Sequence, residues 1–137
     1  MKILVLSFFL FSFSFLFSQG NLQFNKVWNL KYTVAAPNNA NTTVGTITVP
    51  ANKVWKIESA SISIVAGLNY NSEKVNLYVD GHLLVLGGGT TTTNAQIYSA
   101  CPLWLSSGTY PIIVANWVGS PYTTISSLSV IEFNIIP

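Results

Sequence analysis

The stretch KVNLYVDGHLLVL, residues 74–86, carries the strongest fold signal in the chain. Two runs of alternating apolar residues flank Asp80-Gly81, a dipeptide that favours a type I′ turn because both central residues of that turn need positive φ. A two-residue turn also fixes the register of the hairpin. The predicted pairs are Val79–His82, Leu77–Leu84 and Val75–Leu86 on one face, and Tyr78–Leu83 and Asn76–Val85 on the other. We therefore expect an antiparallel hairpin with a largely aliphatic face and His82 at its rim.

The same period of two runs through the residues that precede the hairpin. Over residues 22–34 the even positions are mainly apolar and the odd positions mainly polar, with Lys26 and Val27 as the exceptions. This alternation is typical of a half-buried strand, because successive side chains point to opposite faces of a sheet. We therefore expect one strand with a single apolar face over this range.

Two further segments predict irregular strands. Over residues 53–65 the apolar phase moves from odd to even positions, which indicates a β-bulge near Glu58-Ser59. Pro111 lies inside an otherwise strand-like run, and a proline there favours a sheet edge or a bulge because it has no backbone N–H to donate. Both segments still alternate, so both are expected to be strands.

Short strand-like runs separated by turn residues continue to the end of the chain, and no segment has a convincing helical period. Eight or nine strands at this spacing predict an all-β protein. We expect a single β-sandwich domain over residues 19–137, jelly-roll-like and built from antiparallel strands. A closed barrel is the alternative.

The first 18 residues have the composition of a secretory signal peptide. Lys2 supplies a positive start, residues 3–17 form an apolar run, and Ser18 is a small residue at the expected cleavage point. The run is shorter than the roughly 20 residues that a membrane span needs. We expect a secreted or cell-surface protein, extracellular or periplasmic, with no membrane span after cleavage. An uncleaved N-terminal anchor is the alternative.

Charge composition argues against several kinds of partner. Only 7% of the residues are charged, and the chain contains no arginine. Nucleic-acid and phosphate recognition depend on clustered positive charge and on arginine in particular. The small excess of lysines accounts for the pI near 8.8 without a basic patch. We therefore expect no nucleic-acid partner.

The residue types needed for catalysis are scarce. His82 is the only histidine and Cys101 the only cysteine, whereas a zinc site needs three or four converging ligands. The G-x-S-x-G pattern of a nucleophilic serine is absent. Glu58 and Glu132 could approach one another if their strands pair, but solvated surface charges are the simpler expectation. We expect no catalytic residues, no cofactor and no enzymatic activity.

The turn-like segment at residues 69–73 and the single cysteine each allow two interpretations. Asn69, Asn71 and Glu73 alternate in a turn-like segment and offer oxygen ligands that calcium accepts, although an ordinary turn is expected and no metal is assigned. Cys101 cannot form an intramolecular disulfide because it has no second cysteine. A small, buried hydrophobic role is expected for it, and an intermolecular disulfide is the alternative.

The function must then depend on surfaces. Trp28 falls in the apolar phase of its strand and is expected in the core. The aromatic residues near loops, bulges and strand ends are the candidate ligand-binding residues: Trp55, Trp104, Trp117, Tyr70 and Tyr122. We expect a secreted, non-catalytic surface or structural protein that acts through self-association, for example as a homo-oligomer, or through protein interaction. The alternative is a carbohydrate-binding or adhesive module that uses exposed Trp and Tyr for a glycan or a cell-surface partner.

Overall fold

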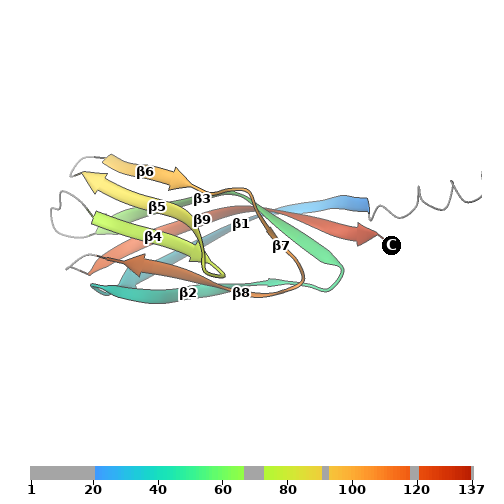
Figure 1. Cartoon of the computed structure of the whole chain (residues 1–137), viewed down its shortest axis with the longest axis horizontal. Helices are drawn as coiled ribbons and strands as arrows, with labels where there is room; N and C mark the ends of the chain where they lie inside the picture. Colours follow the sequence, from blue (N-terminus) through green and yellow to red (C-terminus); the bar gives the residue numbers. More distant parts are fainter. Residues whose placement is uncertain (1–20, 67–72, 91–92, 118–120, 137) are drawn as a thin grey trace, which may run out of the picture.

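The computed structural model describes residues 21–66, 73–90, 93–117 and 121–136, which form β-strands and short connections with no helix in those ranges (Figure 1). The strands are β1 (Asn21–Ala36), β2 (Ala40–Val49), β3 (Lys53–Ala66), β4 (Glu73–Val79), β5 (His82–Thr90), β6 (Thr93–Ser99), β7 (Leu103–Leu105), β8 (Gly108–Asn116) and β9 (Tyr122–Ile136). The predicted all-β class is confirmed.

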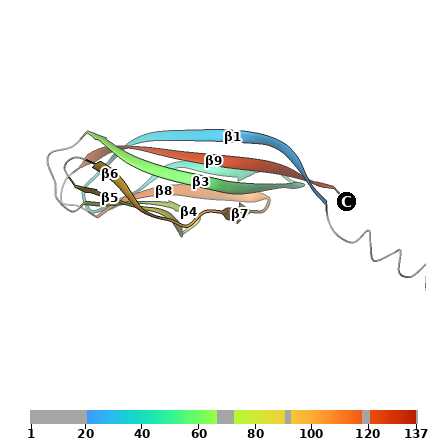
Figure 2. The same ribbon diagram turned by 90° about the horizontal axis from the view of Figure 1, so that it is seen from above.

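The strands form two antiparallel sheets. One has four strands in the order β1-β9-β3-β7, and the other has five in the order β2-β8-β4-β5-β6. Viewed from above, β1, β9 and β3 form one layer, and β4, β5 and β8 lie in the layer beneath them (Figure 2). Apart from the run β4-β5-β6, consecutive strands change sheet, so the two layers are built together along the chain.

The hydrophobic core lies between the two sheets. The four-stranded sheet contributes Ile57, Leu128 and Val130, and the five-stranded sheet contributes residues such as Leu77 and Ile112, all no more than 2% exposed. Even positions of β9 from 124 to 132 are buried and the odd positions between them are only partly buried. This is the alternation that a sheet with one covered face requires.

The hairpin at Asp80-Gly81 forms as predicted, with φ of +50° and +77° at its two central residues. The predicted pairs Val79–His82 and Tyr78–Leu83 are confirmed, but the pairs further from the turn are wrong. Leu84 is an extra residue in β5, so every later partner moves by one position. The observed pairs are Leu77–Val85, Asn76–Leu86 and Val75–Gly87.

Bulges also shape the four-stranded sheet. The predicted bulge in β3 is confirmed, because the register passes from Ile57 to Ser59 and leaves out Glu58. A bulge in β1 was not predicted: Phe24 pairs with β9, Asn25 is left out, and Lys26 pairs next. The single apolar face expected over residues 22–34 is therefore wrong at its start. An extra residue in a strand reverses the faces of all residues beyond it.

Pro111 lies where its missing N–H does little harm. It pairs with β2, whereas β4 pairs with β8 only from Ile112 onward. The carbonyl of Pro111 accepts a hydrogen bond from the backbone N–H of Asp80 in the neighbouring turn. The expectation of an edge at this proline is thus confirmed for the start of β8.

Candidate functional site

The four-stranded sheet has one face on the core and one face turned away from it, here called the outer face. Directly opposed residues of antiparallel strands share a face, and successive residues of one strand alternate between faces. Because Leu128 and Val130 are buried in the core, Ser127 and Ser129 of the same strand lie on the outer face. The pairing register therefore shows which side chains lie together on each face.

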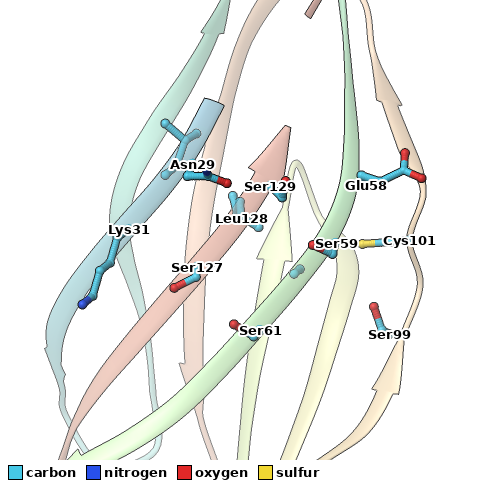
Figure 3. Close-up of a pocket in the computed structure, with 12 residues that line it drawn as sticks. Asn29, Lys31, Glu58, Ser59, Ser61, Ser99, Cys101, Ser127, Leu128 and Ser129 are labelled. Atoms are coloured by element: carbon cyan, nitrogen blue, oxygen red, sulfur yellow. The ribbon is translucent and has the colours of Figure 1, made fainter. Parts of the chain in front are cut away.

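Six polar side chains form two rows across the middle of the outer face. One row is Asn29, Ser129 and Ser59, and the other is Lys31, Ser127 and Ser61. Each row takes one residue from β1, one from β9 and one from β3, as the close-up shows (Figure 3). Hydroxyl and amide groups of this kind both donate and accept hydrogen bonds.

A hollow of about 870 Å³ lies over these rows. Three residues border the hollow on one side: Glu58 of β3, Ser99 at the end of β6, and Cys101 in the segment between β6 and β7. Asn29 and Lys31 lie on the opposite side, and Figure 3 shows the serines of β9 and β3 between the two sides. We call this region, formed by the two polar rows with Glu58, Ser99 and Cys101, the serine hollow.

The outer face changes character toward the start of β1 and the end of β9. Apolar side chains are paired there as Leu22–Ile135, Phe24–Phe133 and Val27–Ile131, with Val54 opposite Phe133 and Trp104 opposite Lys56. Phe24 is 59% exposed and Trp104 is 49% exposed. The Trp104 and Phe133 rings lie 5.6 Å apart between centroids. These residues are called the apolar patch: Leu22, Phe24, Val27, Val54, Trp104, Ile131, Phe133 and Ile135.

Behind the apolar patch, on the inner face, lies a buried carboxylate. Glu132 is only 3% exposed, which contradicts the expectation that it is a solvated surface charge. One carboxylate oxygen, Oε2, accepts hydrogen bonds from the indole N–H groups of Trp55 at 2.9 Å and Trp28 at 3.2 Å. The other, Oε1, accepts from Lys53 Nζ at 3.0 Å and from the side-chain amide of Asn25. These five residues form the Glu132 cluster.

The surroundings keep Glu132 ionised. Burial by itself raises the pKa of a carboxyl group, but hydrogen bonds from Lys53, Asn25, Trp28 and Trp55 outweigh it and lower the pKa of Glu132 to about 2. A carboxylate held by four donors is suited to fixing the positions of those donors. It is poorly suited to giving or taking a proton near neutral pH.

Glu58 and Glu132 do not form a carboxylate pair. Their strands pair as the sequence allowed, but Glu58 lies at the bulge and borders the serine hollow on the outer face. Its carboxylate is 2.7 Å from the ammonium group of Lys56. Glu132 lies on the inner face, so the sheet separates the two acids.

The structure places the five candidate aromatic residues in different environments. Trp55 is 7% exposed and its indole donates to Glu132, so it offers no free ring face. Trp104 is exposed within the apolar patch, and Trp117 is 60% exposed just after β8. Tyr70 lies outside the described residues, and Tyr122 starts β9 but its side chain is not described. The described residues of this set do not gather into one site.

Trp28 is less buried than expected. Trp28 retains 36% exposure, and its ring centroid is 5.8 Å from that of Trp55. The ammonium group of Lys26 lies 3.8 Å from the centroid of the Trp28 ring. It therefore belongs to the edge of the core, where it covers Glu132. The Glu132 cluster was missed from the sequence, although the interruption of alternation at Lys26 and Val27 marks the bulge that brings Asn25 to it.

The remaining chemically interesting residues are dispersed. His82 is exposed beside the Asp80-Gly81 turn, as expected, and Cys101 is a free, half-buried thiol at the serine hollow. Asn69 and Asn71 lie outside the described residues, and the side chain of Glu73 is not described. Within the described ranges, no group of three or more His, Cys, Asp or Glu residues could hold a metal ion.

The described segments include no helix with the length and apolarity of a membrane span.

The outer face of the four-stranded sheet has a polar hollow in its middle and an exposed apolar patch at one end. The serines of β3 and β9 were not identified as site residues from the sequence, because only the pairing of β9 with β1 and β3 brings them together. Comparison of the chain with protein-family models, curated proteins and solved structures finds no match.

Proposed function

We propose that this is a secreted, non-catalytic surface or structural protein that self-associates through the apolar patch. The observation that carries the proposal is the exposure of paired apolar side chains on the outer face, with Leu22 at 46%, Phe24 at 59% and Val27 at 51%. Export is supported by the signal-peptide composition of residues 1–18. An intact mass of the natural product that begins at Gln19 is the expected result for cleavage.

The topology supports a jelly-roll version of the sandwich. If β6 is set aside as an additional edge strand, the two sheets have the orders β1-β9-β3-β7 and β2-β8-β4-β5. Strands from the two ends of the chain then alternate within each sheet, as in a doubled Greek key of eight strands. This topology places the two longest strands, β1 and β9, side by side, with β1 at the edge of its sheet.

The apolar patch lies on a protruding part of the molecule. The start of β1 and the end of β9 reach beyond β2 and β8 (Figure 1). Soluble monomers rarely leave contiguous apolar side chains of this kind uncovered, and large exposed patches usually mark interaction sites. The patch is also aromatic, with Phe24, Phe133 and Trp104, and aromatic residues are enriched in the cores of protein interfaces.

A second copy of the chain is the partner that fits this surface best. The one cation paired into the patch, Lys56, already has partners, since it lies 2.7 Å from Glu58 and 5.5 Å from the Trp104 ring centroid. The patch therefore offers no unpaired charge for a charged partner to match. Two copies related by a two-fold axis would each bury the same apolar surface on the other.

The test is the oligomeric state of the purified protein and of a patch variant. We expect the wild-type protein to dimerise, and Phe24→Ser combined with Val27→Ser to raise the dimer dissociation constant at least tenfold, measured by sedimentation equilibrium. Trp117→Ser is the matched control because Trp117 is as exposed as Phe24 but lies outside the patch. A wild-type monomer at millimolar concentration, or an equal effect of the control, would overturn the proposal.

A further inference from the structure

We propose that the serine hollow is a binding site for a neutral oligosaccharide. The site lies in the middle of the outer face and adjoins the apolar patch, with which it shares Trp104. Its volume of about 870 Å³ lies within the range of roughly 300–1,000 Å³ that is typical of small-molecule sites. The floor consists of three neighbouring strands of one sheet, β1, β9 and β3.

The hydrogen-bonding groups of the floor suit a polyhydroxylated ligand. Strands lie roughly 4.8 Å apart and alternate residues of a strand are roughly 6.8 Å apart, so the two rows form a regular grid of polar side chains. Ser59, Ser61, Ser127 and Ser129 can each donate and accept, and so can the amide of Asn29. Sugar hydroxyl groups also donate and accept, and such a grid can match them without any net charge.

The charges around the hollow favour a neutral ligand. Lys31 lies on one side and Glu58 on the other, as Figure 3 shows, so neither sign dominates. The Glu58 carboxylate is already paired with Lys56 at 2.7 Å. Anionic groups such as phosphate or sulfate are usually held by arginine or by several cations, and this chain has no arginine. A lone lysine is a weak site for such anions.

An aromatic platform stands next to the hollow. Glu58 borders the hollow and is ion-paired with Lys56. Lys56 lies directly opposite Trp104 across the paired strands β3 and β7, and the Trp104 ring retains 49% exposure. A saccharide ring that extends from the hollow past Glu58 would meet this indole. The apolar face of a sugar ring can stack on such a flat aromatic surface. Hydroxyl contacts in the hollow and stacking on Trp104 together define an oligosaccharide and not a single sugar.

The first test is calorimetric titration of the purified protein with cellohexaose, xylohexaose and mannohexaose. We expect at least one of them to bind, and Ser127→Val with Ser129→Val to weaken that binding at least tenfold. The matched control is Ser107→Val, at an exposed serine between β7 and β8 and away from the hollow. Circular dichroism of the variants verifies that each folds like the wild type.

The second test uses the single cysteine of the chain as a reporter. Cys101 lines the hollow and has a free thiol, so a bound saccharide should slow its reaction with N-ethylmaleimide several-fold. The proposal is overturned if none of the three saccharides binds, or if binding is indifferent to Ser127 and Ser129 or leaves Cys101 unprotected. Preference for a sulfated oligosaccharide, or for an extended peptide, would overturn it as well.

Discussion

The middle and the protruding end of the four-stranded sheet are built from the same strands but have opposite polarity. In the middle, Leu128 is buried against the core and Ser129 lies outside. At the end, Glu132 is buried and Phe133 lies outside with Phe24. The alternation of β9 is unbroken from one region to the other, so each face of the strand continues without interruption. The polarity of the two faces reverses because polar residues occupy the outer face in the middle and apolar residues occupy it at the end. Sheet polarity here is a local property.

The reversal is stable because the buried charge has enough partners. A carboxylate taken out of water without partners would cost far more than a folded domain can tolerate. Glu132 has four side-chain donors, and two of them are indoles whose rings also cover it from solvent. The protruding end therefore has a polar, hydrogen-bonded interior, and its apolar side chains lie where a partner can cover them.

The largest expected effect comes from removing the buried charge. Glu132→Gln keeps the size of the side chain but replaces one acceptor oxygen with a donor that faces donors already in place. Breaking a buried ion pair on one side typically costs about 3–5 kcal/mol, and we expect a loss of that order in the free energy of unfolding, measured by urea denaturation.

Glu58→Gln is the control for this substitution, because Glu58 is also ion-paired but exposed. An exposed pair contributes about 0–1 kcal/mol. Equal losses for the two variants would show that the two faces of the sheet do not differ in the way described.

The second effect is a dependence of stability on pH. The pKa of Glu132 is about 2 in the folded protein and 4.5 for an unperturbed glutamate. Since the folded value is the lower one, the ionised group favours folding above the unfolded value, and this stability is lost as the pH falls through 4.5 toward 2. The difference corresponds to about 3 kcal/mol. Urea midpoints between pH 6 and pH 2 should show the loss in the wild type and much less of it in Glu132→Gln.

The smallest effect separates the two indoles. Trp55→Phe and Trp28→Phe each remove one N–H donor to Glu132, and a hydrogen bond to a charged group is worth about 1.5–3 kcal/mol. We expect the full cost at Trp55, which is 7% exposed. At Trp28, which is 36% exposed, we expect roughly half of that cost, because a water molecule can take the place of the lost N–H donor. Thermal unfolding of the two variants measures the difference, and a larger loss at Trp28 would contradict this ranking.

Much of the fold could be predicted from local chemistry. Asp80-Gly81 predicted its own turn, and the change of phase beside Glu58 predicted the bulge, because both signals depend only on neighbouring residues. The extra residue Leu84 could not be found in this way. It lies in a run of four apolar residues, and such a run has no alternation from which the register can be read.

The candidate site was harder to predict. Trp104 was chosen for its place near a turn, and it is exposed, but Trp55 was chosen for its place near the bulge, and it is buried. Which aromatic side chain is covered depends on Glu132, which is far away in sequence and adjacent in space. The serine hollow likewise requires three strands in register, which no single segment of the sequence reveals.

The bulge at Asn25 makes the beginning of the chain's first strand sensitive to odd and even changes in length. Because side chains alternate with a period of two, losing one residue here would move both Leu22 and Phe24 from the outer face to the inner face, whereas losing two would only shorten the strand. Deletion of Asn25 would therefore change which side chains this end of the sheet exposes, and it would also remove one of the four donors to Glu132. A designer who wishes to solubilise or redirect this end of the protein has, in Asn25, a single position at which to do so.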